Sequence, residues 1–128
     1  MALSDLIKQI EGATAPGRDI DVEIALLLGW RRKVEYVKQD EHGEPVRKVF
    51  WVVPTGGDYG KVPRYTSSVD AAMTVVQEVA PGIVGGVSWE EDGRGAAILG
   101  DGPYCQAATP AMALCIAALK AKQTRDDS

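Results

Sequence analysis

The spacing of apolar residues along the chain predicts four helices. Apolar side chains recur every three or four positions over residues 3–13, 20–28 and 68–79, and again from Thr109 onward. This spacing places side chains on one face of a helix. Each of these segments therefore has an apolar face that can pack against a core.

Local residues predict where these helices begin and end. Ser4 suits the N-cap of the first helix, and Gly29 followed by Trp30 suits a Schellman ending of the second. Thr109 and Pro110 are typical of an N-cap and a first helical position. The fourth helix therefore has the best-defined start.

Strands are predicted where β-branched and aromatic residues gather. Residues 33–38 alternate between polar and apolar, whereas 46–54 ("VRKVFWVVP") form a denser apolar run that indicates a more buried strand. The polar hairpin loop between them contains His42. Two further strands are expected on either side of Asp92-Gly93, a pair typical of tight hairpins. Two glycine-containing segments are expected to be loops: 55–63 and 100–108.

The order of these elements predicts an α+β fold. Helix–helix–strand–strand–helix–strand–strand–helix fits one four-stranded, mostly antiparallel sheet covered by helices. At 128 residues the chain is expected to form a single domain, 1–128, with a disordered tail over 123–128.

Charge changes this picture more than composition does. The chain is 45% hydrophobic and 25% charged, which is ordinary for a globular protein, but its net charge of −4 is unevenly distributed. Residues 31–64 contain eight Lys or Arg and five Asp or Glu, a net +3; the rest contains six and thirteen, a net −7. Because nucleic acids favour a broad basic face, this argues against general nucleic-acid binding. The basic segment better suits a small anionic ligand or an acidic protein patch.

Neither a membrane nor an oxidising compartment is indicated. No apolar run approaches the roughly 18 residues of a membrane span, and the N-terminus lacks the apolar region of a signal peptide. Cys105 and Cys115 form neither a disulfide framework nor a zinc pattern. We therefore expect a cytoplasmic protein without a cofactor.

Few residues indicate catalysis or metal binding. The segment "GGDYGK" resembles a phosphate-binding loop, but Thr55 stands where the first glycine belongs and Val62 follows the lysine. His42 lies among acidic residues and offers too few ligands for a transition metal. Cys105 precedes a helix, so a catalytic thiol, alone or paired with His42, stays open as an alternative.

The segment "PRYTSSVDAAMTVV", residues 63–76, suggests a site for an anion. Ser67 and Asp70 resemble a capping box at the start of the third helix. A helix N-terminus also attracts anions, and a nearby arginine can grip phosphate or carboxylate. The cap leaves several residues unexplained, and the preceding loop adds two more. These are the candidate ligand-binding residues: Arg64, Tyr65, Thr66, Ser68, Tyr59 and Lys61.

Several segments resemble one family of small phage and prophage proteins, the phage ABA sandwich domain family. They are "LGW" at 28–30, "PRYTSSVDAAMTVV", "VSWEEDGRGAA" and "ATPAMALCIAALKAK". The resemblance covers residues 3–122 but does not include the basic hairpin at 31–54. It implies an α/β/α sandwich and a phage or prophage origin, and it implies no particular activity.

These observations favour a non-catalytic binding protein acting in the cytoplasm of an infected host cell. Its partner would be a small anionic or nucleotide signal, sequestered as a counter-defence, or a host protein. Two alternatives stay open: a small enzyme using Cys105 or acting on a nucleotide, and a virion or assembly component. The apolar residues of the first two helices also leave open a homo-oligomer.

Overall fold

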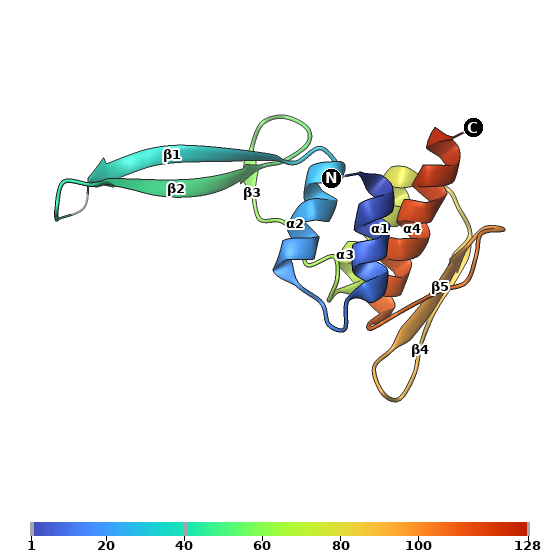
Figure 1. Ribbon diagram of the computed structural model, residues 1–128. Helices are drawn as coiled ribbons and strands as arrows, with labels where there is room; N and C mark the ends of the chain where they lie inside the picture. The colour runs from blue at the N-terminus through green and yellow to red at the C-terminus, as the bar shows by residue number, and fades with distance from the viewer. Residues whose placement is uncertain (1, 40, 128) are drawn as a thin grey trace.

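The chain is an α+β protein in which helices and strands form separate layers (Figure 1). The structure is a computed structural model that describes residues 2–39 and 41–127. Its helices are α1 (Leu3–Gly12), α2 (Arg18–Leu27), α3 (Val69–Val79) and α4 (Pro110–Asp126). Its strands are β1 (Arg31–Gln39), β2 (Pro45–Val52), β3 (Tyr59–Gly60), β4 (Gly85–Trp89), β5 (Gly95–Leu99) and β6 (Cys105–Ala107).

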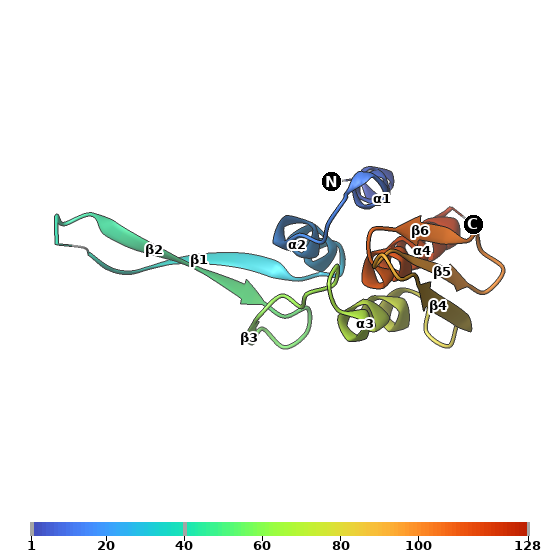
Figure 2. The same cartoon turned by 90° about the horizontal axis from the view of Figure 1, so that it is seen from below.

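The expected single four-stranded sheet is wrong, because the strands divide into two sheets. Over the described residues, β1, β2 and β3 form one three-stranded antiparallel sheet, and β4, β5 and β6 form another. The short strands β3 and β6 lie in segments that we expected to be loops. All four helices lie on the same side of the β4–β6 sheet (Figure 2).

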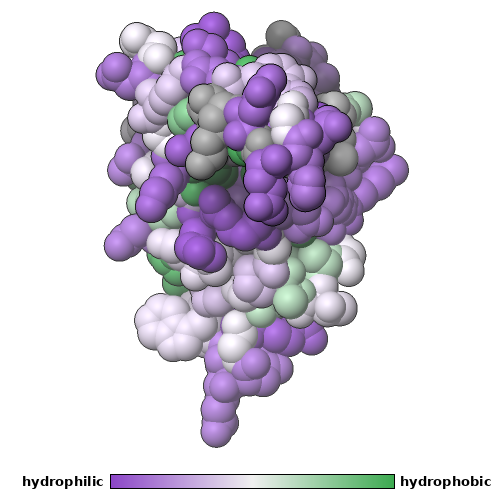
Figure 3. Space-filling model, turned by 90° about the vertical axis from the view of Figure 1, so that its left-hand side faces the viewer, coloured by the Kyte–Doolittle hydropathy of each residue, from purple (hydrophilic) through white to green (hydrophobic). Residues whose placement is uncertain are grey.

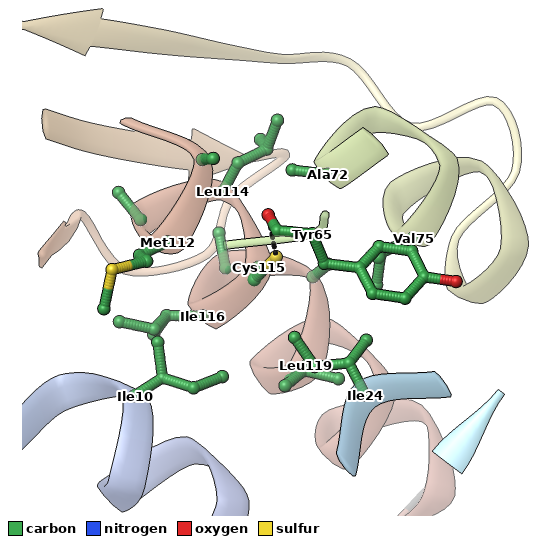
Figure 4. Close-up of a cluster of buried hydrophobic side chains, with 14 of the residues drawn as sticks. Ile10, Ile24, Tyr65, Ala72, Val75, Met112, Leu114, Cys115, Ile116 and Leu119 are labelled. Atoms are coloured by element: carbon green, nitrogen blue, oxygen red, sulfur yellow. Dashed lines mark hydrogen bonds between the residues drawn. The ribbon is translucent and has the colours of Figure 1, made fainter. Parts of the chain in front are cut away.

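The core is built around α4. Residues 111–119 of this helix are all buried, between the β4–β6 sheet on one side and α1 and α3 on the other. The predicted start of α4 is confirmed: Pro110 occupies the first turn, and the Thr109 hydroxyl accepts a hydrogen bond from the Met112 N–H at 3.0 Å. Figure 4 shows side chains of α4 meeting Ile10 of α1, Ile24 of α2 and Val75 of α3.

A glycine permits the close contact between α4 and the second sheet. A Cβ atom added at Gly95 of β5 would lie 2.3 Å from the Pro110 Cα and 2.5 Å from its nitrogen. These are backbone atoms, which a small rearrangement of a side chain cannot clear. The seating of α4 on β5 therefore requires glycine at this position.

The end of α4 differs from expectation. Residues 123–126, expected to be disordered, continue the helix. Two contacts hold this last turn: the Arg125 guanidinium donates to the Val79 carbonyl at the end of α3, and Lys122 pairs with Asp126 at 3.2 Å.

Of two other predicted helix ends, the C-terminus of α2 matches the sequence signal and the N-terminus of α1 does not. Gly29 adopts φ 102°, and the Trp30 N–H donates to the Ala25 carbonyl at 3.0 Å, which confirms the Schellman ending of α2. The expected Ser4 N-cap is wrong, because α1 begins at Leu3, so that Ser4 lies inside the helix, and Ala2 precedes it without a side-chain cap.

The first sheet forms an arm that extends away from the helices. We call β1, β2 and the described residues between them the arm; Figures 1 and 2 both show it projecting from α2. As expected, β2 is more buried than the described residues of β1, because Val46, Phe50 and Trp51 are half-buried and Val52, at its base, is buried; the other residues of β2 are exposed. The β-branched and aromatic residues that predicted burial are compatible with any pleated strand, whether or not a core covers it.

Candidate functional site

The six residues predicted to bind an anion do not form one surface. Tyr65 and Thr66 are buried at 2% and 0% exposure, and Ser68 is half-buried. Arg64 and Lys61 are exposed, and Tyr59 packs on the arm. The segment before α3 therefore turns two of its polar residues inward.

Thr66 is held by a buried carboxylate that the sequence did not single out. The Thr66 N–H and hydroxyl both donate to Asp21 Oδ1, at 2.8 and 2.7 Å. The hydroxyl also accepts a bond from the Gly17 N–H at 3.1 Å, at the start of α2. Thr66 therefore links the segment before α3 to α2.

Arg18 balances the charge of Asp21, which is only 1% exposed. Its guanidinium donates to Asp21 Oδ2 at 2.9 Å and to the carbonyls of Val62 and Pro63 at 2.8 and 3.2 Å. A buried carboxylate is tolerated when its oxygens are paired in this way. The spacing of Arg18 and Asp21, three residues apart on a helix, was the sequence signal for the ion pair.

Neighbouring backbone groups tie the same segment to α4. The Thr109 hydroxyl donates to the Thr66 carbonyl at 2.8 Å, and the Cys115 thiol donates to the Tyr65 carbonyl at 3.4 Å, the contact dashed in Figure 4. Burial raises the pKa of Cys115 and that of Tyr65, each to about 12. Both groups are therefore neutral parts of the core.

The residue that caps α3 is Ser68. Its hydroxyl accepts a hydrogen bond from the Ala71 N–H at 3.2 Å, and the helix begins at Val69. The Ser67–Asp70 capping box is therefore wrong by one position, because two consecutive serines offered equivalent local signals. The hydroxyl oxygen of Ser68 is therefore occupied by a backbone N–H of the first helical turn, as is usual for an N-cap.

Arg64 lies at a small hollow that is poorly suited to an anion. The hollow has a volume of about 130 Å³, and its lining includes Arg18, Asp21, Arg64 and Thr66. Arg18 is already engaged by Asp21 and two carbonyls, and the Asp21 carboxylate is itself part of the lining. Of the charged residues that line the hollow, Arg64 is the cation that could contact a ligand, and the nearby carboxylate of Asp21 would repel an anion bound there.

One face of the arm carries a polar and aromatic cluster. We call it the aromatic face. The rings of Phe50 and Tyr59 stack with centroids 4.6 Å apart, and Lys33 and Lys48 lie 5.6 Å and 5.3 Å from the Tyr59 and Phe50 centroids. The Tyr59 hydroxyl donates to Glu35 at 2.7 Å, and Lys33 pairs with Glu35 at 3.2 Å.

These contacts stabilise charge on the aromatic face. The hydrogen bond from Tyr59 and the pair with Lys33 lower the pKa of Glu35. Tyr59 first and Glu35 second raise the pKa of Lys33. Tyr59, a candidate ligand residue, is thereby committed to the arm's own structure, although 48% of it is exposed.

The opposite face of the arm is apolar and uncovered. Register places Val34 opposite Val49 and Tyr36 opposite Arg47, and directly opposed residues of antiparallel strands share a face. Val34, Val49 and Tyr36 are 39%, 41% and 66% exposed. We call this the apolar face; the exposed arginines Arg32 and Arg47 flank it.

Both long edges of the arm are also largely open. The sheet order is β1-β2-β3, so β1 is an edge strand, and β3 covers β2 only at Trp51 and Val52. Figure 3, which faces the molecule from the side of the arm, shows a largely hydrophilic surface interrupted by pale and apolar areas. Open edges and exposed apolar residues are features that proteins usually avoid or use for binding.

The structure does not support a reactive thiol at Cys105. Cys105 is 3% exposed, its thiol donates to the Pro103 carbonyl at 3.5 Å, and burial raises its pKa, which disfavours the reactive thiolate. The described part of the hairpin loop that holds His42 lies at the far end of the arm from β6 (Figures 1 and 2). A Cys105–His42 pair is therefore not formed.

Residues 2–39 and 41–127 contain no cluster of three or more His, Cys, Asp or Glu placed to hold a metal ion. In the same part of the chain, no helix combines the length and hydrophobicity needed to cross a membrane. Comparison with known protein families, with curated proteins and with solved structures gave no match to the chain.

Proposed function

We propose that the chain is a non-catalytic binding protein that occupies a partner protein through its arm. The observation that carries this proposal is the exposure of Val34, Tyr36 and Val49 on a hairpin with no core beneath it. A two-stranded hairpin gains little stability in water by itself, so these side chains do little for the fold. Contact with a partner gives them a role.

Charge indicates what kind of partner surface fits. The segment 31–64 has a net charge of +3, and the rest of the chain has −7. Arg32 and Arg47 stand beside the apolar face. An acidic protein patch with an apolar centre would complement this arrangement, while the acidic remainder of the chain would repel the same patch and restrict contact to the arm.

The phage setting belongs to the same proposal. The resemblance to the phage ABA sandwich family suggests a protein acting in the cytoplasm of an infected bacterium, where the partner would be a host protein. The arm is the part of the chain that this resemblance does not include, and an added element is a reasonable place for a specific function.

Sequestration of a nucleotide signal is the less supported version. It requires arginine together with aromatic faces for base stacking. Three aromatic residues could supply such a face, but Tyr65 is buried, Trp51 is half-buried, and Tyr59 already stacks on Phe50.

The test compares two tyrosines of nearly equal exposure. Tagged protein is used to capture partners from a bacterial host, and the affinity for the recovered partner is then measured by titration. We expect Tyr36→Thr to weaken binding at least ~10-fold, which corresponds to about 1.4 kcal/mol. Tyr104→Thr is the control, because Tyr104 is 68% exposed, compared with 66% for Tyr36, and lies off the arm.

Two results would overturn the proposal. One is equal binding by the wild type and the Tyr36→Thr variant. The other is release of a nucleotide from the purified protein, detected by mass spectrometry and abolished by Arg64→Ala, which would restore the sequestration hypothesis.

A further inference from the structure

The free edge of β1 is regular over a short, defined segment. Residues 31–36 of β1 pair one-to-one with β2, and the register shifts between Tyr36 and Lys38. Such a bulge bends the strand and disrupts regular pairing. Any strand that adds to the outer edge of β1 is therefore limited to residues 31–36.

A second copy of the chain is a natural candidate for this edge. Two identical edge strands can pair antiparallel about a twofold axis perpendicular to the sheet. Opposed side chains then share a face, so a residue can be opposed only by one an even number of positions away. This restriction leaves a small set of registers to compare.

The charges of β1 distinguish between these registers. With Lys33 on the axis, two lysines oppose each other; with Glu35 on the axis, two glutamates do. Registers centred on Arg31 or Arg32 oppose two arginines, and one centred on Tyr36 extends into the bulge. Like charges directly opposed across strands are destabilising.

The register centred on Val34 avoids every one of these conflicts. Val34 opposes Val34 of the second copy, and Lys33 and Glu35 of each copy oppose Glu35 and Lys33 of the other. Arg32 opposes Tyr36 in the same way, which allows a cation–π contact. The paired residues, 32–36, lie within the regular segment.

We propose that two copies of the chain pair antiparallel along β1 with Val34 on the twofold axis, so that the two three-stranded sheets join into one six-stranded sheet with the two β1 strands at its centre. The Val34–Val49 pair of each arm then continues into that of the other as one apolar row. A contact of this length is small compared with stable interfaces, which bury roughly 1,200 Å² or more, so we expect a reversible dimer. The dimer forms through the backbone edge of β1, whereas the proposed function rests on the outward side chains of the apolar face; Val34 and Tyr36 take part in both.

Disulfide formation tests the register directly. The native Cys105 and Cys115 are buried, so mild oxidation should link only introduced cysteines. Val34→Cys should give at least ~5-fold more covalent dimer than Lys33→Cys or Glu35→Cys alone, because opposed positions in a sheet lie within disulfide reach and diagonal ones do not. A mixture of Lys33→Cys and Glu35→Cys chains should form the mixed dimer. Val49→Cys, on the same face but on the inner strand, is the control.

Sedimentation provides a test without a covalent bond. The average mass of the wild type should rise above 13.7 kDa with concentration. Glu35→Lys should stay monomeric, and the charge swap Lys33→Glu with Glu35→Lys should restore the dimer. A wild type that remains monomeric to about 1 mM, or Val34→Cys chains that cross-link no better than Val49→Cys, overturns the inference. Either result leaves partner binding by the apolar face untouched.

Discussion

Replacing Thr66 by valine tests whether the buried network fixes the segment before α3. Valine keeps nearly the same shape and removes only the hydroxyl. That hydroxyl donates to Asp21 at 2.7 Å and accepts from the Gly17 N–H at 3.1 Å. Both partners lose a bond in a place where water has little access, since Thr66 is 0% and Asp21 1% exposed.

The expected cost follows from these two bonds. A hydrogen bond to a charged group contributes about 1.5–3 kcal/mol, and a neutral one about 1 kcal/mol, so Thr66→Val should destabilise the fold by about 2–4 kcal/mol. The cost stays below that of an unpaired buried charge, because Asp21 retains the Thr66 N–H and Arg18. Since whole domains are stable by only about 5–15 kcal/mol, the loss should be easy to measure.

Urea unfolding provides the assay, with two control variants. Thr66→Ser keeps the hydroxyl and loses one methyl group, so it should cost about 1 kcal/mol. Thr74→Val removes an exposed hydroxyl that donates to the Ala71 carbonyl, and should cost less than about 0.5 kcal/mol. If Thr66→Val costs no more than Thr66→Ser, the hydroxyl does not hold the segment and the reasoning fails.

Three further predictions concern packing, the arm and alkaline pH. Gly95→Ala should destabilise the protein by about 1–3 kcal/mol in urea unfolding, because the new Cβ would clash with the Pro110 backbone. Gly86→Ala is the control: a Cβ there has open space around it, so stability should change by less than about 0.5 kcal/mol. Equal costs for the two variants would contradict the packing argument. Replacing residues 34–49 by Asn-Gly joins Lys33 to Phe50 through a two-residue turn. The melting temperature of the helical body, measured by calorimetry, should stay within a few degrees, because none of the described residues among those removed belongs to the core; loss of the melting transition would contradict this. The free energy of unfolding should keep its full value below pH 9 and fall above it, because folding raises the pKa of Cys115 from 9.0 to about 12 and that of Tyr65 from 10.0 to about 12. In urea titrations, Cys115→Ala should make this decline less steep between pH 9 and 10, and an unchanged slope would rule out the thiol as its cause.

The features that the sequence predicted well are local ones. Thr109 with Pro110 and Gly29 with Trp30 specify helix ends through neighbours within a few residues, and the structure confirms both. The start of α3 shows the limit of such signals, because Asp70 favoured Ser67 as the cap, whereas the neighbouring Ser68 caps the helix in the structure.

Features that depend on distant partners were not predictable in the same way. The burial of Thr66 depends on Asp21, which is 45 positions away in the chain. From the sequence alone, the polar residues around Thr66 are equally compatible with an exposed binding site. The position of β2 outside the core likewise depends on which strands pair. The composition of β2 predicts a strand but does not predict which part of the protein, if any, packs on it.

The central position of α4 also has a consequence for how the protein is made. Every helix and strand that packs on α4 precedes it in the sequence. During synthesis these elements leave the ribosome before the apolar helix that completes their core, so their apolar faces stay uncovered until α4 has been made. The arm has no such dependence, because β1 and β2 are neighbours in the chain and pair mainly with each other. We expect the nascent chain to expose the residues of its arm before it has a folded body to carry them.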